Sequence, residues 1–489
     1  MESKLDGVLA GQIGPGSHFS VETRRSLPRL TTSVTGRVTV TQPLDKVLNF
    51  KLSLMMFLQY AIWGAWLPLL YPYLKNHMKF ADGDIGNMFA VGAVGAILAP
   101  FIAGQIADRF FRTEHFLALS HLAGAAVVWQ LASIEPGEGA VNQFLIFSLI
   151  YSLIYSPTLS LTNSLSFHHL PDRDRDFGRV RVWGTVGWIA VGIIIGQHLL
   201  KSYAGGDFAN AASPEVYAGY ADAFRLSAII GAGMGIFCFL LPATPPGGKA
   251  EDNATFAALG EVKRQPLLTL FALAVPISCI HQFYFVHTSG FLGTLQTQLN
   301  DADLANSINT LFGIGGGGLM TVGQMSEILV LAMIPLLASK FSRKQLLLMG
   351  LIAYALRMAI FAYAPGWLGE SAMGLVLVGV ALHGFCFGCF IFVAFMIVDE
   401  ECRMDIRASA QSLFNLVIVG IGIIVGSKIA TSVSVWANDT SVITEGTPWH
   451  LPYERLFSIP MWASVICIGI LLLCYPSGSN SDNEEKTAS

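Results

Sequence analysis

The chain has 489 residues, of which 53% are hydrophobic and 13% are charged, and its formal net charge is −4. Soluble domains carry about 25% charged residues, so this composition excludes an ordinary soluble domain and predicts an all-α membrane protein. The small net charge gives no reason to expect a nucleic-acid partner.

Both ends of the chain are polar. The first 46 residues contain several arginines but no apolar run long enough for a secretory signal. They are predicted to form a disordered cytoplasmic extension, and residues 477–489 a disordered cytoplasmic tail.

Twelve apolar runs between these ends have about the length that crosses a bilayer. They cover approximately residues 50–74, 83–107, 114–134, 141–167, 180–200, 222–243, 266–292, 319–339, 345–365, 371–398, 407–431 and 454–475. The polar, Pro- and Gly-rich segment 244–265 divides them six and six. We therefore expect two six-helix bundles, residues 47–243 and 266–476, joined by a cytoplasmic linker around a central cavity.

Basic residues set the expected orientation. The connections after the second, fourth, sixth, eighth and tenth runs are rich in Lys and Arg, whereas those after the first, third, seventh and ninth carry few or none. By the positive-inside rule, both termini are expected in the cytoplasm, with the chain spanning the cytoplasmic membrane many times.

The first run places Gln59, Trp63 and Trp66 on one helical stripe. An amide flanked by indoles suits a planar, hydrogen-bonding ligand, because a ring stacked on an aromatic side chain gains about 1–3 kcal/mol. The alternative is aromatic packing near the outer interface, which is equally compatible with Trp66.

The second run ends in Gly104-Gln-Ile-Ala-Asp108-Arg109. This hexapeptide resembles the G-x-x-x-D-R loop of the major facilitator superfamily, in which it lies between the bundles on the cytoplasmic side. We expect a structural or gating role for Gly104, Asp108 and Arg109. The alternative is an ordinary charged pair at a helix end.

The fourth and fifth runs add further polar groups. Asn163 is a candidate ligand, although it could instead hold helices together. Arg181, Thr185 and Trp188 share one stripe of the fifth run. The alternative for Arg181 is a basic residue that only marks the cytoplasmic mouth of its helix.

The seventh run carries His281, Gln282 and His287. The two histidines are six residues apart and do not share a helical face, so no metal site is expected. Gln282 is the better ligand candidate. Cys386-x-x-Cys389 has no second ligand pair and is interpreted as helix packing, and no cofactor is expected.

Glu327 lies near the middle of the eighth run, one turn after Gln324. An ionisable group there costs at least a few kcal/mol and is interpreted as a substrate, ion or proton site. Arg357 in the ninth run offers the alternative of a structural ion pair with Glu327. His383 in the tenth run is a second candidate for proton coupling.

Six elements in order resemble the nucleoside:proton symporter family of the major facilitator superfamily, across about residues 47–475. They are LQYAIWGAWL, Y-x-P-T-L-x-L-x-N, R-x-W-G-T-x-G, Q-x-S-E, L-R-x-A-x-F-A-Y and the segment IRASAQ that contains Arg407. The resemblance implies proton-driven uptake of nucleosides. By position it assigns substrate contacts to Arg181, Thr185, Trp188, Gln282, Gln324 and Glu327, and we place Arg357 and Arg407 with the structural or gating residues.

Two departures from the family pattern concern the site. Gly388 stands where the family has an Asp, and Phe285 replaces a polar residue. The loss of the acid leaves coupling or ribose recognition open, with His383 as a possible substitute, and the added apolar surface leaves substrate preference open.

The sequence as a whole predicts a secondary active transporter that imports nucleosides with protons by alternating access, for which a monomer is sufficient. A proton-coupled importer of another polar solute, such as a sugar or a nucleoside catabolite, remains an alternative, and a solute sensor with a transporter fold is a weaker one. No paired nucleophile and base, metal cluster or phosphate loop points to an enzyme.

Overall fold

The computed structural model describes residues 30–32, 38–40, 43–102, 112–245, 260, 262–298, 303–315, 317–402 and 407–476. Residues 45 onward form one compact unit, and residues 1–44 form another. In the smaller unit, β1 (Leu30–Thr32) pairs antiparallel with β2 (Val38–Val40). These six residues differ from the expected disordered segment.

The first half of the larger unit is helical. Its elements are α1 (Lys46–Trp66), η1 (Leu67–Leu69), α2 (Leu70–Pro72), η2 (Tyr73–His77), α3 (Asp82–Ile102), α5 (Thr113–Leu131), α6 (Ala140–His169), α7 (Arg173–Ser202), η4 (Phe208–Asn210), α8 (Pro214–Gly219) and α9 (Ala221–Cys238). Asp45 and Asp172 cap the N-termini of α1 and α7, because each carboxylate accepts a hydrogen bond from a backbone N–H in the first turn.

The second half is also helical. It contains α11 (Leu267–Gln298), α12 (Asp303–Phe312), α13 (Gly317–Lys340), α14 (Arg343–Leu368), η5 (Gly369–Ser371), α15 (Ala372–Ala381), α16 (His383–Phe385), η6 (Cys386–Phe392), α17 (Val393–Glu401), α18 (Arg407–Asn415), η7 (Leu416–Ile421), α19 (Gly422–Ala437) and α20 (Leu451–Cys474). A reciprocal capping box between Ser342 and Gln345 begins α14.

Helices occupy all twelve apolar runs that the sequence singles out. Within the described residues, ten helical stretches are long and apolar enough to cross a membrane, and α3 and α5 are the two runs outside that set. The all-α prediction is therefore confirmed for this unit, while the full count of twelve spans stays a prediction.

One helix was not expected. The segment between α11 and α13 was interpreted as a loop, yet it contains α12. Its apolar residues Leu304, Ile308, Leu311 and Phe312 recur at helical spacing. The helix is too short to span a bilayer, which is why a search for long apolar runs overlooks it.

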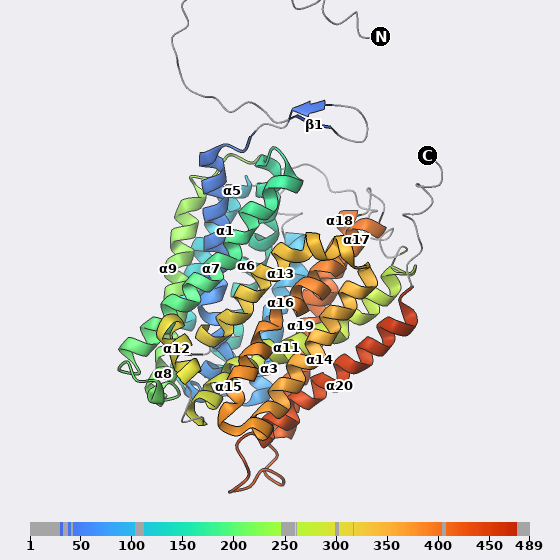
Figure 1. The fold of residues 1–489 in the computed structure, drawn as a ribbon. Coiled ribbons are helices and arrows are strands. Elements are labelled where there is room, and N and C mark those ends of the chain that lie inside the picture. The colour runs from blue at the N-terminus through green and yellow to red at the C-terminus, as the bar shows by residue number, and fades with distance from the viewer. Residues whose placement is uncertain are drawn as a thin grey trace, which may run out of the picture. The chain divides into compact units, whose positions relative to one another are not determined.

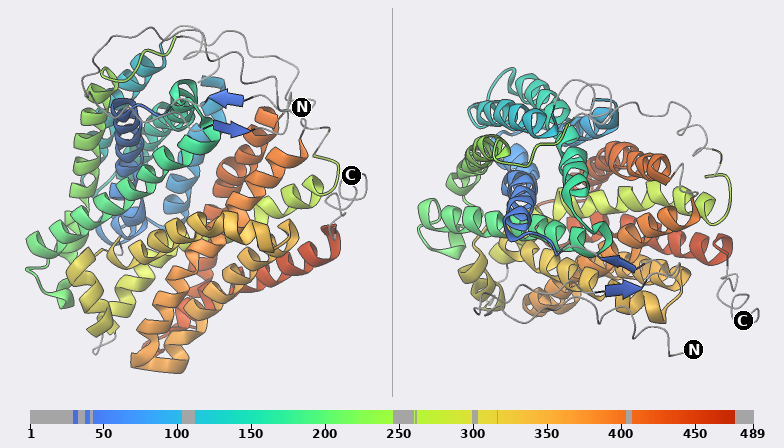
Figure 2. Two further views of the ribbon diagram at one scale, coloured as in Figure 1. Left: turned by 45° about the horizontal axis from the view of Figure 1, so that its top comes forward. Right: turned by 90° about the horizontal axis from the view of Figure 1, so that it is seen from above.

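Helices pack mainly with others of their own half. In the first half, α1 packs on α7 and α9, α5 on α9 and α6, and α3 on α6. In the second, α14 packs on α20 and α11 on α19. Figures 1 and 2 show the blue-to-green and yellow-to-red helices as two groups. The groups meet along two seams, α7 with α13 and α3 with α19.

Glycine permits the closest of these approaches. A Cβ added at Gly187 of α7 would lie 2.1 Å from the carbonyl oxygen of Phe57 in α1. No other residue fits this contact without separating the helices. The packing holds the face of α7 that bears Arg181, Thr185 and Trp188 in a fixed rotation relative to α1.

Candidate functional site

A small cavity lies at the seam between α7 and α13. Its empty volume of about 250 Å³ includes space that is open to solvent, so the enclosed part is much smaller than a typical ligand pocket. The lining residues come from both halves of the chain: Gly64, Pro68, Trp188, Gly192, Met320, Thr321 and Gln324. Two predicted ligands, Trp188 and Gln324, are therefore brought together.

Glu327 lies one helical turn from Gln324 on α13, so the two side chains share a face. The Glu327 side chain is 15% exposed, and Gln324 is buried. The protein therefore does not enclose the Glu327 carboxylate completely.

Arg181 is the cation of α7 whose charge acts on Glu327. Its guanidinium lies 4.0 Å from the centre of the Tyr60 ring, a cation–π contact that holds it at the α1–α7 interface. Among the described residues, no ion pair joins Arg181 to Glu327. The attraction acts across the seam without closing it.

The charge of Arg181 on α7 acts on Glu327 of α13, and Trp188 of α7 lines the cavity together with Gln324 of α13. The half-buried Thr185 lies between Arg181 and Trp188 along α7. Predicted ligands from the two halves therefore lie on both sides of one seam.

His383 of α16 connects Glu327 to Arg357. Its Nε2 lies 3.5 Å from Oε2 of Glu327, and its Nδ1 accepts a hydrogen bond from Nη1 of Arg357 at 3.1 Å. The alternative of a direct Glu327–Arg357 ion pair is wrong for this structure, because the imidazole lies between the two groups.

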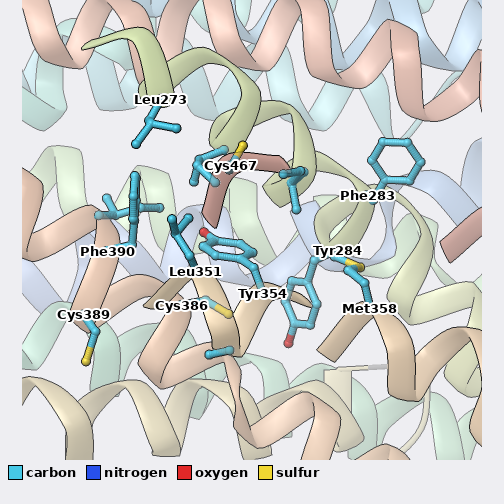
Figure 3. Close-up of a cluster of buried hydrophobic side chains, with 14 of the residues drawn as sticks. Leu273, Phe283, Tyr284, Leu351, Tyr354, Met358, Cys386, Cys389, Phe390 and Cys467 are labelled. Atoms are coloured by element: carbon cyan, nitrogen blue, oxygen red, sulfur yellow. The ribbon is translucent and has the colours of Figure 1, made fainter. Parts of the chain in front are cut away.

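Arg357 is fully buried on α14. Its guanidinium lies 4.3 Å from the centre of the Tyr284 ring and 5.0 Å from that of Tyr354. Figure 3 shows both tyrosines beside Cys386 in the apolar core of the second half. The rings give the cation a favourable surface in place of a carboxylate.

The polar residues of α11 lie close to this core. Gln282 is buried and packs so tightly on Gly426 of α19 that an added Cβ there would lie 2.9 Å from its Cγ. His281 Nδ1 pairs with the Tyr354 hydroxyl at 2.7 Å. His287 Nε2 donates to the Ala430 carbonyl at 3.1 Å. Both histidines thus have partners within the second half.

Gln59 and Trp63 face α6. Nε2 of the fully buried Gln59 donates to Thr158 Oγ1 at 2.8 Å, while its Oε1 has no hydrogen-bond partner. Trp63 packs on Tyr155 with ring centres 5.1 Å apart. Asn163 has a buried Oδ1 without a partner. The Gln59 amide thus uses one of its two N–H groups within the first half, while the unpaired oxygens of Gln59 and Asn163 remain available to a ligand or water.

The structure describes only some of the residues that the other predictions concern. Gly104, Asp108 and Arg109 lie outside the described residues, and Arg407 is the first residue of α18. Cys386 and Cys389 are free and buried in η6, and of the seven cysteines only Cys474 is exposed. The described part of the chain holds no cluster of three or more metal-ligating side chains.

The seam is tightly closed at one end. Ile314 N donates to the Gly196 carbonyl at 3.1 Å, and Gln197 Nε2 donates to the Thr310 carbonyl at 2.9 Å. Gly313 has φ +84°, and a Cβ there would lie 2.0 Å from the carbonyl carbon of Gly196. The end of α7 and the α12–α13 connection therefore meet backbone to backbone, which only glycine allows.

Sequence reasoning missed Thr321, which lines the cavity, and Tyr60, which contacts Arg181. Thr321 lies one turn before Gln324 and lines the same cavity, so helical spacing was a usable signal. Tyr60 holds Arg181, but nothing in the spacing of the two residues predicts this contact, because they belong to helices distant in the sequence.

Comparison with known proteins places these features in context. Residues 47–478 match a family described as nucleoside H+ symporter. The chain is 33% identical to the putative nucleoside transporter YegT of Escherichia coli K12 over 78% of this chain and 83% of that protein. It is 29% identical to the xanthosine permease of the same organism, over 77% and 85% of the two chains.

Solved structures show the fold. The crystal structure of the nucleoside transporter NupG superposes with a TM-score of 0.70 at 23% identity, covering 87% of this chain and 98% of that one. A D-xylose–proton symporter superposes with a TM-score of 0.63 at 14% identity, over 88% and 98%. The helices are therefore arranged in the major facilitator fold.

Proposed function

Because the chain belongs to the nucleoside H+ symporter family, we propose that it imports nucleosides across the cytoplasmic membrane together with protons. The observation that carries the proposal is the cavity between α7 and α13, where Trp188 faces Gln324 and the partly exposed Glu327 lies one turn away. This site joins an aromatic surface, an amide and an acid.

The site suits both parts of a nucleoside. Trp188 offers a face on which a base stacks, and an amide such as Gln324 both donates and accepts hydrogen bonds. Arg181 and Thr185 belong to the α7 wall, and Gln282 belongs to α11, which packs on α19; we assign all three to contacts with the ribose or base. Gln59, Trp63 and Asn163 do not line the cavity, and the unpaired oxygens of Gln59 and Asn163 would contact substrate directly or through water.

Glu327 is the proposed proton carrier. Protonated, it is neutral and compatible with a closed, dry seam; ionised, it is attracted by Arg181 on the opposite wall. Proton binding therefore changes the force between α7 and α13. This is the differential interaction that links proton occupancy to the opening of the cavity.

The proposed orientation in the membrane follows from the distribution of basic residues. Basic connections at the ends of α6 and α13, among others, support cytoplasmic termini. The tight contact between Gly196 and Gly313 would then lie on the outer side and close the outer entrance. Gly104, Asp108, Arg109 and Arg407 would act at the opposite, cytoplasmic entrance.

The test is transport by the purified protein in proteoliposomes. Uptake of labelled uridine is measured with an inward proton gradient, without a gradient, and with a protonophore. The proposal predicts accumulation only with the gradient. Uridine uptake that ignores the gradient would contradict proton symport, and the absence of uptake for every nucleoside tested would contradict the substrate class.

A second candidate is proton-coupled uptake of another polar solute. Phe285 favours it. Its apolar ring lies 5.0 Å from the His281 ring, at a position where the pattern of the family that the sequence resembles has a polar residue. Competition of labelled uridine by unlabelled nucleosides, free bases and sugars separates the two. Stronger competition by sugars than by nucleosides would favour the second candidate.

A further inference from the structure

The Arg357–His383 hydrogen bond fixes which nitrogen of His383 carries a hydrogen. A guanidinium has only donors, so Nδ1 of His383 must accept from Arg357 Nη1. A neutral imidazole has one N–H, and this hydrogen must therefore lie on Nε2. That nitrogen is the one directed at Oε2 of Glu327.

The surroundings of His383 oppose a second proton on its ring. Protonated Nδ1 would direct an N–H at the N–H of Arg357 and place two cations in contact. The titratable and charged groups around the imidazole are Glu327 on α13, Tyr354 and Arg357 on α14, His281 and Tyr284 on α11, and Cys386 on η6, with Arg181 on α7 acting on Glu327 from across the seam.

The aromatic neighbours hold the ring in place. Tyr284 stacks on His383 at 4.7 Å with an interplanar angle of 16°, and the His281 ring lies 5.5 Å away. His383 is 2% exposed. This enclosure, together with a partner at each nitrogen, favours one orientation of the ring.

We propose that His383 is a positioning residue for proton transport: a neutral hydrogen-bond donor whose tautomer is locked by Arg357 and whose Nε2–H orients the Glu327 carboxylate. The transported proton then binds Glu327 and never His383. Arg357 acts through His383 and has no direct contact with the carboxylate. This inference rests on the proposed function, in which Glu327 carries the proton.

Three variants test the inference in proteoliposomes, each with membrane abundance, uridine counterflow and the pH profile of gradient-driven uptake. His383→Gln keeps an N–H donor but does not titrate. His383→Leu removes the donor. Arg357→Gln removes the cation and the obligatory donor, which frees the imidazole to exchange tautomers.

The inference predicts that His383→Gln accumulates uridine with the wild-type pH profile. In His383→Leu the half-maximal transition moves to higher pH, because the carboxylate has lost a donor that favours its charged form. In Arg357→Gln neither ring nitrogen is forced to accept, so ¹⁵N NMR of labelled histidine should show His383 as a mixture of both tautomers. In the wild type the same signal should show a hydrogen on Nε2 alone, and the double variant Arg357→Gln/His383→Gln, which lacks the signal, assigns it.

The contrary result is clear. If His383→Gln retains counterflow but no longer accumulates uridine, His383 carries the proton and the inference is wrong. If Arg357→Gln still shows only the Nε2–H form of His383, the tautomer lock is wrong, and this outcome does not depend on whether His383→Gln folds. Failure of wild-type protein to couple uridine to protons would instead reject the proposed function.

Discussion

Trp188 of α7, in the first half of the chain, and Gln324 of α13, in the second half, line the same cavity. A ligand that contacts both side chains bridges the two halves of the chain. Its binding energy therefore depends on the separation of α7 and α13, which is the quantity that changes when the halves move. Substrate recognition and conformational change share these two residues.

Replacing Trp188 by Ala should weaken nucleoside binding. Loss of one stacked base costs about 1–3 kcal/mol, which corresponds to a roughly 5- to 150-fold rise in KM. Trp188→Phe keeps a ring and should show a smaller rise. Trp183→Ala, an exposed tryptophan on the same helix, is the matched control and should leave KM unchanged. Equal effects at both positions would exclude stacking on Trp188.

Glu327→Gln should separate transport from proton coupling. The amide preserves shape and polarity but has no exchangeable charge at this depth, so counterflow of uridine should persist while accumulation against its gradient disappears. Glu215→Gln, at an exposed glutamate of α8, serves as the control and should accumulate uridine normally. Continued accumulation by Glu327→Gln would show that another group carries the proton.

Gln59→Met should affect stability more than affinity. The substitution removes the hydrogen bond from Nε2 to Thr158 Oγ1, a loss of about 0.5–1.5 kcal/mol, and should lower the melting temperature in detergent. The KM for uridine should not change, because the amide bonds to Thr158 within the first half and does not line the cavity. A large rise in KM with unaltered melting would place Gln59 at the substrate.

Gly313→Ala should open the closed end of the seam. Positive φ costs a non-glycine residue about 1–2 kcal/mol, and the added methyl would also collide with Gly196. Gly205→Ala is a matched control, because Gly205 has φ +64° with nothing within 4 Å of the added Cβ. The readout is labelling of a cysteine at the cavity position Thr321 by an impermeant thiol reagent.

Labelling from the outer side should rise in Gly313→Ala and stay low in Gly205→Ala. The comparison removes the shared backbone strain and leaves only the contact with Gly196. Equal labelling in the two variants would mean that the contact between Gly196 and Gly313 does not hold the outer entrance closed.

Gly388→Asp, which restores the acid of the family pattern, should lower the amount of folded protein. An added Cβ lies 2.8 Å from Cγ1 of Val330 and 3.8 Å from Cδ1 of Ile334, so the carboxylate would enter an apolar contact at a cost of about 2.5–3.5 kcal/mol. Gly388→Asp/Val330→Ala makes room and should recover part of the loss. Full abundance and activity of Gly388→Asp alone would contradict this packing argument.

The positions of the helices were largely predictable, because a span requires a long apolar run and such runs are visible in one sequence. The residues at which the helices begin and end were less predictable. The fifth run was placed at about residue 180, yet α7 begins at Arg173, since Asp172 caps charged turns that a search for apolar residues ignores. Helix α12 was missed because its signal is periodicity rather than length.

The site was predictable only along single helices. Spacing placed Gln324 with Glu327, and Arg181 with Thr185 and Trp188, because side chains three, four or seven apart share a face. Spacing cannot show that His383 separates Glu327 from Arg357. That arrangement depends on how α13, α14 and α16 cross, which tertiary packing decides.

The burial of six cysteines, with Cys474 alone at the surface, gives the unmodified protein one addressable thiol. A maleimide dye would attach at the last residue of α20 without prior removal of the other six. Paired with a second fluorophore on the first half, it would report the rocking of the two halves in single molecules that retain their native sequence apart from one substitution.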